Sequence, residues 1–325
     1  PWVRLWVLAL SLALLLVGGW ELGWRSIGFV ASVEDDWGIW ASRRRRVKDT
    51  PTVVALVGAS RIQLGIEPEK FRAQSGRRAV MLAVDGNAPM PVLADLAEDP
   101  SFTGSVIVSY VPMFFAEAAA NEERVRKWLR KYRTQTWSSR FETALRIGVQ
   151  ERFVLRYPGL APARIWEHLL EGTRPRLIYA PMRADRYRAA NYDLIDIVKL
   201  RKARANRERR RHLEAQPLSS EVFEQRVKAI ALLVRRILTR EGRVAFVRMP
   251  SVGLVRRLEA DAWPRRPYWD RLASRIAVPF IHFEDYPALS AFDCPDGSHL
   301  GAADAQTFTA ALVKILSEKG FFDAK

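Results

Sequence analysis

Residues 52–60 read Thr-Val-Val-Ala-Leu-Val-Gly-Ala-Ser, an uncharged, β-branched run that ends at Gly58 and leads into Ser60. A short, continuous apolar run closed by a small residue is typical of a strand that is covered on both faces. Such a strand needs a helical layer on each side, so this stretch predicts an α/β fold. A serine just past the carboxyl end of the strand would lie at the rim where α/β folds bind ligands.

Four further runs have the same character and predict the remaining strands, at residues 79–84, 105–111, 243–249 and 278–283. Helical patterns lie between or after them, at residues 67–75, 91–98, 218–241, 268–276 and 302–319. Alternating strands and helices imply right-handed crossovers between parallel strands. The sequence therefore predicts a three-layer, doubly wound, mostly parallel sheet of the flavodoxin-like type.

The segment at about 115–240 interrupts this alternation and is too long for a simple crossover. Its patterns predict helices at residues 121–132, 134–156, 162–170 and 195–214. We interpret it as a helical insertion or lid. Its charged stretch, residues 199–211, has almost no apolar face and is predicted to be a solvated helix or a loop.

The N-terminal stretch Leu5–Trp20 is apolar without a charge. A spanning helix needs about 20 apolar residues, so residues 1–26 are predicted to be a transmembrane anchor with tryptophans near its ends. A cleaved signal peptide and a buried helix are the alternatives, and the lack of a small-residue cleavage pattern favours the anchor. Residues 27–50 are then expected to be a basic linker and residues 51–325 the α/β domain.

The net charge of +16 favours anionic partners. Two runs carry much of it, Arg43–Lys48 and Lys199–Arg211, and a solvated surface is the plain alternative for both. Neither run is interleaved with stacking aromatic residues, so nucleic acid is not an expected partner. The one cysteine, Cys294, and the absence of paired Cys or His motifs give no support for a metal or another cofactor.

A second polar stretch, Cys294-Pro-Asp-Gly-Ser-His-Leu-Gly301, precedes the last predicted helix. The spacing between Asp296 and His299 allows the carboxylate to fold back onto the imidazole and fix its tautomer. Such a histidine can accept the proton of a serine hydroxyl, here that of Ser60. Each motif alone also has a local interpretation, because Ser60 could cap a helix and Asp296 could simply form a turn.

Taken together, Gly58-x-Ser60-Arg61 after the first strand and Asp296-x-x-His299-Leu before the last helix resemble the SGNH/GDSL hydrolase superfamily. The resemblance covers roughly residues 50–114 and 242–320, and the anchor is similar to that of bacterial cell-surface O-acetylation proteins. It implies Ser60 as nucleophile, His299 as base and Asp296 as its orienting acid.

The same resemblance implies an oxyanion hole formed by the N–H of Ser60 and by Gly86. The family's third-block asparagine is absent here, and Asn87 is proposed as its replacement, against a plain turn asparagine. Losing one oxyanion donor typically costs about 10²–10³-fold in turnover, which puts full activity in doubt. Arg61 is a candidate to pair with an anionic group or with an acidic neighbour.

The expected function is therefore a serine esterase or O-acyltransferase that acts on an acyl ester and a cell-surface glycan. The resemblance implies a single-pass protein of the bacterial inner membrane with a periplasmic body, although Arg43–Arg46 favour a cytoplasmic body by the positive-inside rule. One alternative is a weakly active or inactive scaffold that binds polysaccharide or a membrane acyltransferase partner. Another is a basic protein that binds anionic lipid or polymer through residues 199–211.

Overall fold

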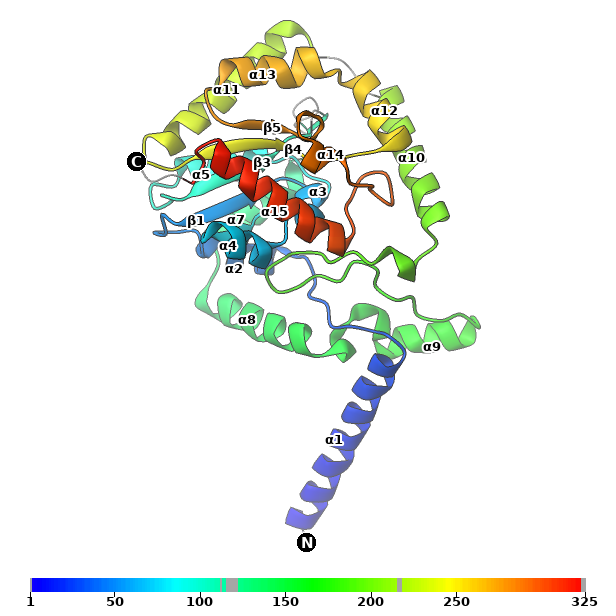
Figure 1. Cartoon of the computed structure of the whole chain (residues 1–325). Coiled ribbons are helices and arrows are strands. Elements are labelled where there is room, and N and C mark those ends of the chain that lie inside the picture. Colours follow the sequence, from blue (N-terminus) through cyan, green and yellow to red (C-terminus); the bar gives the residue numbers. More distant parts are fainter. Residues whose placement is uncertain (1, 112, 115–121, 215–217, 323–325) are drawn as a thin grey trace.

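The computed structural model describes residues 2–111, 113–114, 122–214 and 218–322, and it contains a five-stranded parallel sheet (Figure 1). The strand order is β2-β1-β3-β4-β5, the flavodoxin-like order. The strands are β1 (Val53–Val57), β2 (Arg78–Met81), β3 (Ser105–Ser109), β4 (Val244–Arg248) and β5 (Phe280–His282). The predicted α/β class is confirmed, and all five predicted strands are present; each is shorter than predicted, and β2 begins one residue before its predicted start.

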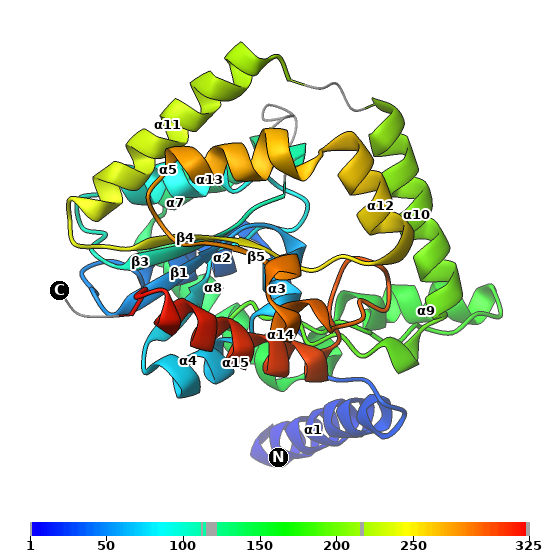
Figure 2. The same ribbon diagram turned by 45° about the horizontal axis from the view of Figure 1, so that its top comes forward.

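Helices cover both faces of the sheet (Figure 2). Successive residues of β1 point to opposite sides, so that Val53 and Ala55 join one hydrophobic cluster while Val54 and Leu56 join the other. The first cluster includes α5 (Met90–Glu98), α11 (Ser220–Leu238) and α13 (Arg271–Arg275), and the second includes α4 (Pro68–Ser75), α14 (Pro287–Ser290) and α15 (Ala302–Glu318). Burial on both faces explains why the strands are continuously apolar.

The pairing of β1 with β2 continues past the end of the strands. Leu82 N–H donates to Leu56 O at 2.8 Å, and Val84 N–H donates to Gly58 O at 2.9 Å. This register brings the turn after β2 beside the turn after β1. Asp85, Gly86 and Ser60 therefore line the same cavity at the carboxyl edge of the sheet.

Two short helices near this edge were not predicted. Ser60 is the first residue of α3 (Ser60–Gly65), where the sequence had suggested a loop, and α12 (Gly253–Ala262) follows β4. Short helices form in context because packing, rather than propensity, supplies most of their stability. The start of α3 at Ser60 matters for the site, since the first N–H groups of a helix have no partner within the helix.

The predicted insertion contains α7 (Glu123–Arg133), α8 (Trp137–Arg152), α9 (Pro162–Leu170) and α10 (Ile197–Glu214), with short turns η1 (Val154–Arg156), η2 (Pro158–Leu160) and η3 (Tyr192–Leu194). Its first residues, 115–121, lie outside the described part of the chain. α10 packs along α12, and α7 packs against α5. α11, the last helix before β4, covers the sheet beside α5 and so acts as a crossover helix. A π-helical turn, η4 (Arg266–Asp270), precedes α13, and η5 (Phe283–Asp285) follows β5.

Residues 27–50 differ from the expected basic linker, because they belong to the folded body. Within α2 (Trp37–Arg45), the fully buried Trp40 donates its indole N–H to Leu82 O at 2.9 Å. Arg44 is only 1% exposed and pairs with Asp95 at 2.7 Å and Asp99 at 2.8 Å. A count of positive residues could not reveal these carboxylates on α5, which allow an arginine to be buried.

The N-terminal helix α1 (Trp2–Ser26) projects from the body (Figure 1). Its 25 residues span about 37 Å at about 1.5 Å per residue, and a hydrocarbon core is about 30 Å thick. Glu21 is its only buried residue. The prediction of a long apolar N-terminal helix is confirmed, and its length and composition suit a signal anchor or a signal sequence.

Candidate active site

Ser60 and His299 meet at the carboxyl edge of the sheet, although 239 positions separate them in the chain. Ser60 Oγ lies 2.8 Å from His299 Nε2, and His299 Nδ1 lies 2.9 Å from Asp296 Oδ2. Ser60 begins α3 shortly after β1, and His299 lies in the loop that leads into α15. The three side chains expected to cooperate therefore form one continuous chain of hydrogen bonds.

The loop around Asp296 fixes the direction of this hydrogen-bond chain. Asp296 Oδ1 accepts the N–H groups of Ser298 at 2.9 Å and His299 at 2.8 Å, which leaves Oδ2 for the imidazole. Gly297, between them, has a φ of +86°, a backbone conformation that favours glycine. Because an ionised carboxylate can only accept, Nδ1 carries the proton and Nε2 is left to accept from the hydroxyl of Ser60.

Burial and charge tune both titratable groups. Asp296 is fully buried, which opposes its ionisation, but the hydrogen bond from His299 and the nearby charges hold the pKa of its carboxyl well below the usual range. Burial lowers the pKa of His299, and the charges of Arg204 and Arg61 lower it further, against the opposing effect of Asp296. A buried histidine with a lowered pKa is neutral at pH 7 and ready to act as a base.

Arg204, on α10, completes this cluster. Its Nε lies 3.1 Å from Asp296 Oδ2, and its side chain is largely buried. The sequence analysis offers the run 199–211 as a solvated surface or as a binding surface for anionic lipid or polymer, and it assigns Arg204 no role beside Asp296. A signal was nevertheless available: Arg204, Arg207 and Arg211 recur at i, i+3 and i+7, so that they share one face of a helix. That face lines the same cavity as Ser60 and His299.

Two backbone N–H groups are available beside the serine. Within the described residues no hydrogen bond occupies the N–H of Ser60, at the start of α3, or that of Gly86. Gly86 has a φ of +68° and lines the cavity together with Ser60. The N–H of Ser60 and that of Gly86 are thus candidates to stabilise an oxyanion.

Asn87 does not join this cavity. Its side-chain amide donates to Asp85 O at 2.7 Å, and its N–H donates to Val84 O at 3.1 Å. These are the contacts of the turn asparagine that the sequence offered as the alternative. Asn87 is not among the residues that line the cavity of Ser60, so in this conformation it does not take the place of the third-block asparagine of the SGNH pattern.

Arg61 lines the same cavity as Ser60, and its guanidinium belongs to a buried ion cluster. It forms a two-pronged pair with Glu259 and donates from Nε to Ser298 Oγ at 3.2 Å. Glu259 also pairs with Arg248 at 2.6 Å and accepts from Ser251 Oγ at 2.9 Å. Of the two partners expected for Arg61, the acidic neighbour is the one observed, and the contact with Ser298 braces the loop that carries His299.

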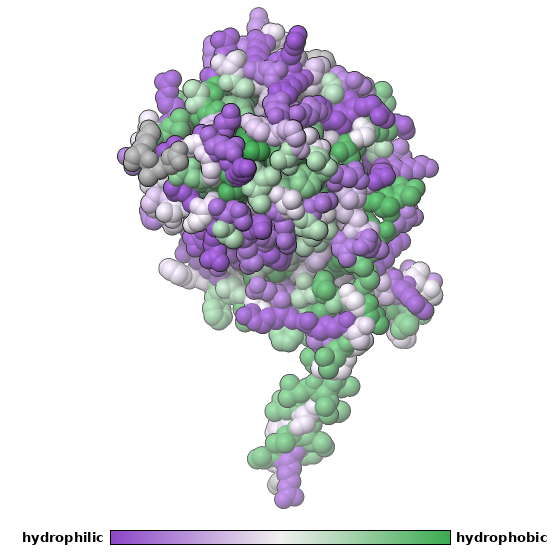
Figure 3. All heavy atoms as spheres, in the orientation of Figure 1, coloured by the Kyte–Doolittle hydropathy of each residue, from purple (hydrophilic) through white to green (hydrophobic). Residues whose placement is uncertain are grey.

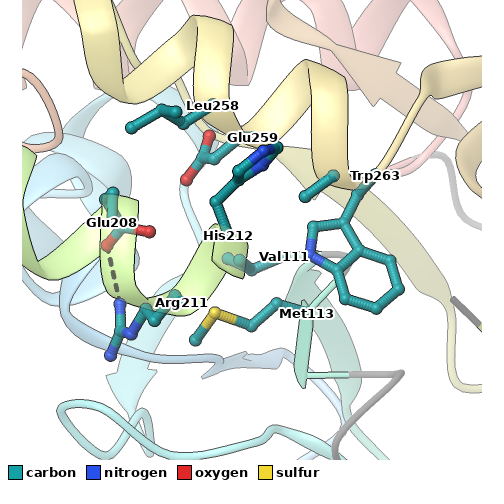
Figure 4. A pocket seen from close by; sticks show the side chains of 9 residues that line it. Val111, Met113, Glu208, Arg211, His212, Leu258, Glu259 and Trp263 are labelled. Carbon is teal, nitrogen blue, oxygen red and sulfur yellow. Dashed lines mark hydrogen bonds and ion pairs between the residues drawn. The ribbon is translucent and has the colours of Figure 1, made fainter. Parts of the chain in front are cut away.

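The cavity has a polar side and an apolar side. Arg207 and Arg211, from α10, line it opposite Val111 and Phe114, which follow β3. An adjoining apolar pocket opens between α10 and α12, and Figure 4 shows the side chains of Met113, Leu258 and Trp263 around it. His212 of α10 also faces this pocket. Ser60 and His299 therefore lie near both the apolar pocket and the cationic face of α10.

Within the described part of the chain no group of three or more His, Cys, Asp or Glu side chains could hold a metal ion. Comparison of the sequence with known protein families finds no family model that matches, and no curated protein is significantly similar. A functional proposal for this chain therefore rests on the geometry of the site around Ser60 and on the chemistry of its residues.

Proposed function

We propose that this chain is a serine-type esterase or O-acyltransferase of the SGNH kind, with Ser60 as nucleophile, His299 as base and Asp296 as its orienting acid. The observation that carries the proposal is the continuous hydrogen-bond chain of 2.8 Å and 2.9 Å between these three side chains. Nucleophile, base and orienting acid within hydrogen-bond reach are the usual signature of covalent acyl transfer.

In the proposed reaction the hydroxyl of Ser60 attacks the carbonyl carbon of an acyl ester while its proton passes to His299 Nε2. The N–H groups of Ser60 and Gly86 stabilise the negative oxygen that forms. The intermediate then expels the alcohol of the donor, which takes the proton from Nε2 and leaves an acyl group on Ser60. A water molecule or a sugar hydroxyl next gives its proton to Nε2 and attacks the acyl carbon; the bond to Ser60 Oγ then breaks, and Nε2 returns the proton to Oγ, which restores Ser60 and the neutral imidazole.

The walls of the site suit the two groups that such a reaction brings together, the acyl group and its acceptor. A small apolar recess lined by Val111, Met113 and Trp263 suits the methyl end of a short acyl group such as acetyl. The face of α10 that carries Arg207 and Arg211 suits a polar or acidic acceptor such as a cell-surface glycan. Since neither a metal ligand cluster nor a nucleotide-binding motif was expected from the sequence, the proposed chemistry uses no cofactor.

We further propose that α1 anchors the protein in the bacterial inner membrane as a single pass, with the body in the periplasm. The length and apolar composition of α1 support the anchor. The resemblance to cell-surface O-acetylation proteins supports the periplasmic location of the body. A membrane acyltransferase that supplies acyl groups would then be a natural partner.

The test uses the full chain in detergent micelles and an acetyl-ester reporter. We expect measurable turnover, loss of that turnover in Ser60→Ala, and covalent labelling of the unsubstituted chain by a serine-reactive phosphonate. Ser290→Ala is the matched control, since Ser290 lies in α14 away from the cavity. Equal turnover in the unsubstituted chain and in Ser60→Ala would remove Ser60 as the nucleophile.

A second candidate function is a catalytically inactive scaffold of the same fold that holds polysaccharide or a membrane acyltransferase partner. One observation favours it: among the described residues no asparagine or glutamine side chain lines the cavity, so that no third amide donor for an oxyanion is found there. The phosphonate separates the two candidates. A scaffold would retain glycan binding but would fail to label at Ser60.

A further inference from the structure

The helix α8 carries an apolar stripe that faces away from the body. Trp137, Phe141 and Leu145 follow one another at helical spacing and are between 61% and 82% exposed. The opposite face of the same helix is buried through Thr143 and Ile147. This helix therefore covers the body with one side and presents large hydrophobic side chains on the other.

The helix α9 repeats the arrangement. Trp166, Leu169 and Leu170 recur at i, i+3 and i+4 and are between 63% and 72% exposed. Together with Trp137, Phe141 and Leu145 they form what we call the basal surface. Large apolar residues gathered in this way on a protein surface mark an interaction site.

The basal surface lies where α1 leaves the body. In Figure 1 α8 and α9 run across the end of the molecule from which α1 projects, one on each side of it. Figure 3 shows the apolar atoms of α1 continuing upward into apolar atoms at this end of the body. The spanning helix and the basal surface are thus neighbours in space, although more than a hundred residues separate them in the chain.

Specific contacts fix α1 relative to the basal surface. The carboxylate of Glu21 accepts the N–H groups of Val154 and Leu155, both at 2.9 Å, in the turn that joins α8 to α9. Arg25 binds the same carboxylate and donates to Arg152 O at the end of α8. Phe29 and Trp24 pack beside Val154 and Leu160. A helix held by these contacts cannot swivel freely on the body.

We infer that the basal surface is a membrane-interface surface, which rests the body on the lipid bilayer entered by α1. Helices with one apolar and one polar face lie in the interfacial plane of a bilayer, and tryptophan and arginine are favoured at that depth. The Arg140 guanidinium stacks over the ring of Trp137 at 4.8 Å, a pairing suited to headgroups above and hydrocarbon below.

The position of α1 favours lipid as the occupant over a second copy of the chain or a protein partner. The basal surface lies at the level where α1 leaves the body. It therefore meets the bilayer as soon as α1 inserts, and no partner protein has to bind first. The inference rests on the proposed membrane insertion of α1 and is independent of the proposed ester chemistry.

The test uses the full chain reconstituted in vesicles of phosphatidylethanolamine and phosphatidylglycerol. A nitroxide label is attached in turn to Leu145→Cys, Leu169→Cys and, as control, Leu213→Cys, an exposed leucine on α10 away from the base. The native Cys294 is buried, so an unsubstituted chain provides the labelling background. We expect the first two labels to be more accessible to oxygen than to a water-soluble nickel complex, and the control label to show the reverse order.

Two results would overturn the inference. Preferential access of the nickel complex at both Leu145→Cys and Leu169→Cys would place the basal surface in water. Exclusion of both reagents, with dipolar broadening between labels, would show that a second copy covers it. Turnover of the ester reporter by the same samples tests the Ser60 site separately, so that a failure of either proposal is recognised on its own.

Discussion

The guanidinium of Arg204 lies 3.1 Å from the carboxylate of Asp296, the same carboxylate that orients the imidazole of His299. A cation at this position weakens the electrostatic support that Asp296 gives to a protonated histidine. Burial is the largest cause of the lowered pKa of His299, and the charge of Arg204 adds to it. In the proposed mechanism only the neutral imidazole accepts the proton of Ser60, so the charge of Arg204 would extend the activity of the proposed base toward lower pH.

Arg204→Gln should therefore raise the pKa of His299 and move the acid limb of the pH–rate profile to higher pH. The measurement is kcat/KM for the ester reporter as a function of pH. Arg207→Gln is the matched control, because Arg207 lines the same cavity and forms no ion pair within the described residues. An acid limb that stays in place in Arg204→Gln would mean that its charge does not act on His299.

Asp296→Asn should lower kcat/KM by about 10⁴-fold, because an amide can stabilise the wrong imidazole tautomer and cannot offset the charge of imidazolium. The Asn oxygen can still accept from the N–H groups of Ser298 and His299, so the loop should keep its shape. Asp293→Asn, an exposed acid in the same loop, is the control. Kinetics together with an unchanged melting temperature would separate lost catalysis from lost folding.

The carboxyl group of Glu259 should make the free energy of unfolding depend on pH in the acid range. Burial opposes its ionisation, but Arg61 and Arg248 hold its pKa at about 2, against an ordinary value of 4.5. For a lowered carboxyl pKa the stabilisation is complete above pH 4.5 and is lost as the pH falls toward about 2. Glu259→Gln should lower the free energy of unfolding at pH 7 by about 3–5 kcal/mol, since it leaves two buried arginines without their partner.

Denaturant unfolding of the detergent-solubilised chain at several pH values measures this effect. The difference between the unsubstituted chain and Glu259→Gln should shrink steadily below pH 4.5. Glu318→Gln, at an exposed position of α15, should leave the whole curve unchanged. A constant difference across the acid range would contradict the linkage to Glu259.

Trp40→Ala should cost about 3–5 kcal/mol in the free energy of unfolding, because it empties a fully buried site and removes the hydrogen bond to Leu82 O. A linker residue would show no such loss. Trp137→Ala, at a position 82% exposed, is the matched control and should change stability little in detergent. Equal free energies of unfolding for Trp40→Ala and Trp137→Ala would indicate that residues 27–50 are a linker after all.

Ala262→Phe should narrow the apolar pocket between α10 and α12. If that pocket holds the end of the acyl chain, kcat/KM for a butyryl ester should fall by about tenfold relative to acetyl ester, since each buried methylene contributes about 0.8 kcal/mol. The readout is the ratio of rates on acetyl and butyryl reporters. An unchanged ratio would locate the acyl group elsewhere.

Much of the fold could be predicted because its strands are buried on both faces. The run at residues 52–57 predicted β1 within one residue at its start, and the helix predicted at 162–170 matches α9. The prediction failed for α2, since an arginine-rich stretch such as residues 43–48 has the same composition whether carboxylates or water surround it. It also failed for α3 and α12, which are too short for a clear helical period.

The candidate site was predicted in part. Ser60, Asp296 and His299 were named from two short motifs, and the structure brings all three together. Asn87 does not join them, because its amide forms a local bond to Asp85 O. Arg204 was missed because a charged run by itself carries no information about which of its members will face a buried carboxylate.

The sequence alone determined the features that depend on local order along the chain. They include the apolar strands, the length of α1 and the loop in which Asp296 reaches His299, because near neighbours need no distant partner. Only the tertiary structure decided which distant groups meet. It brought Ser60 to His299, Arg204 to Asp296 and Glu21 to Val154, since these contacts depend on parallel strands ending at one edge and on helices that pack against segments distant in the chain.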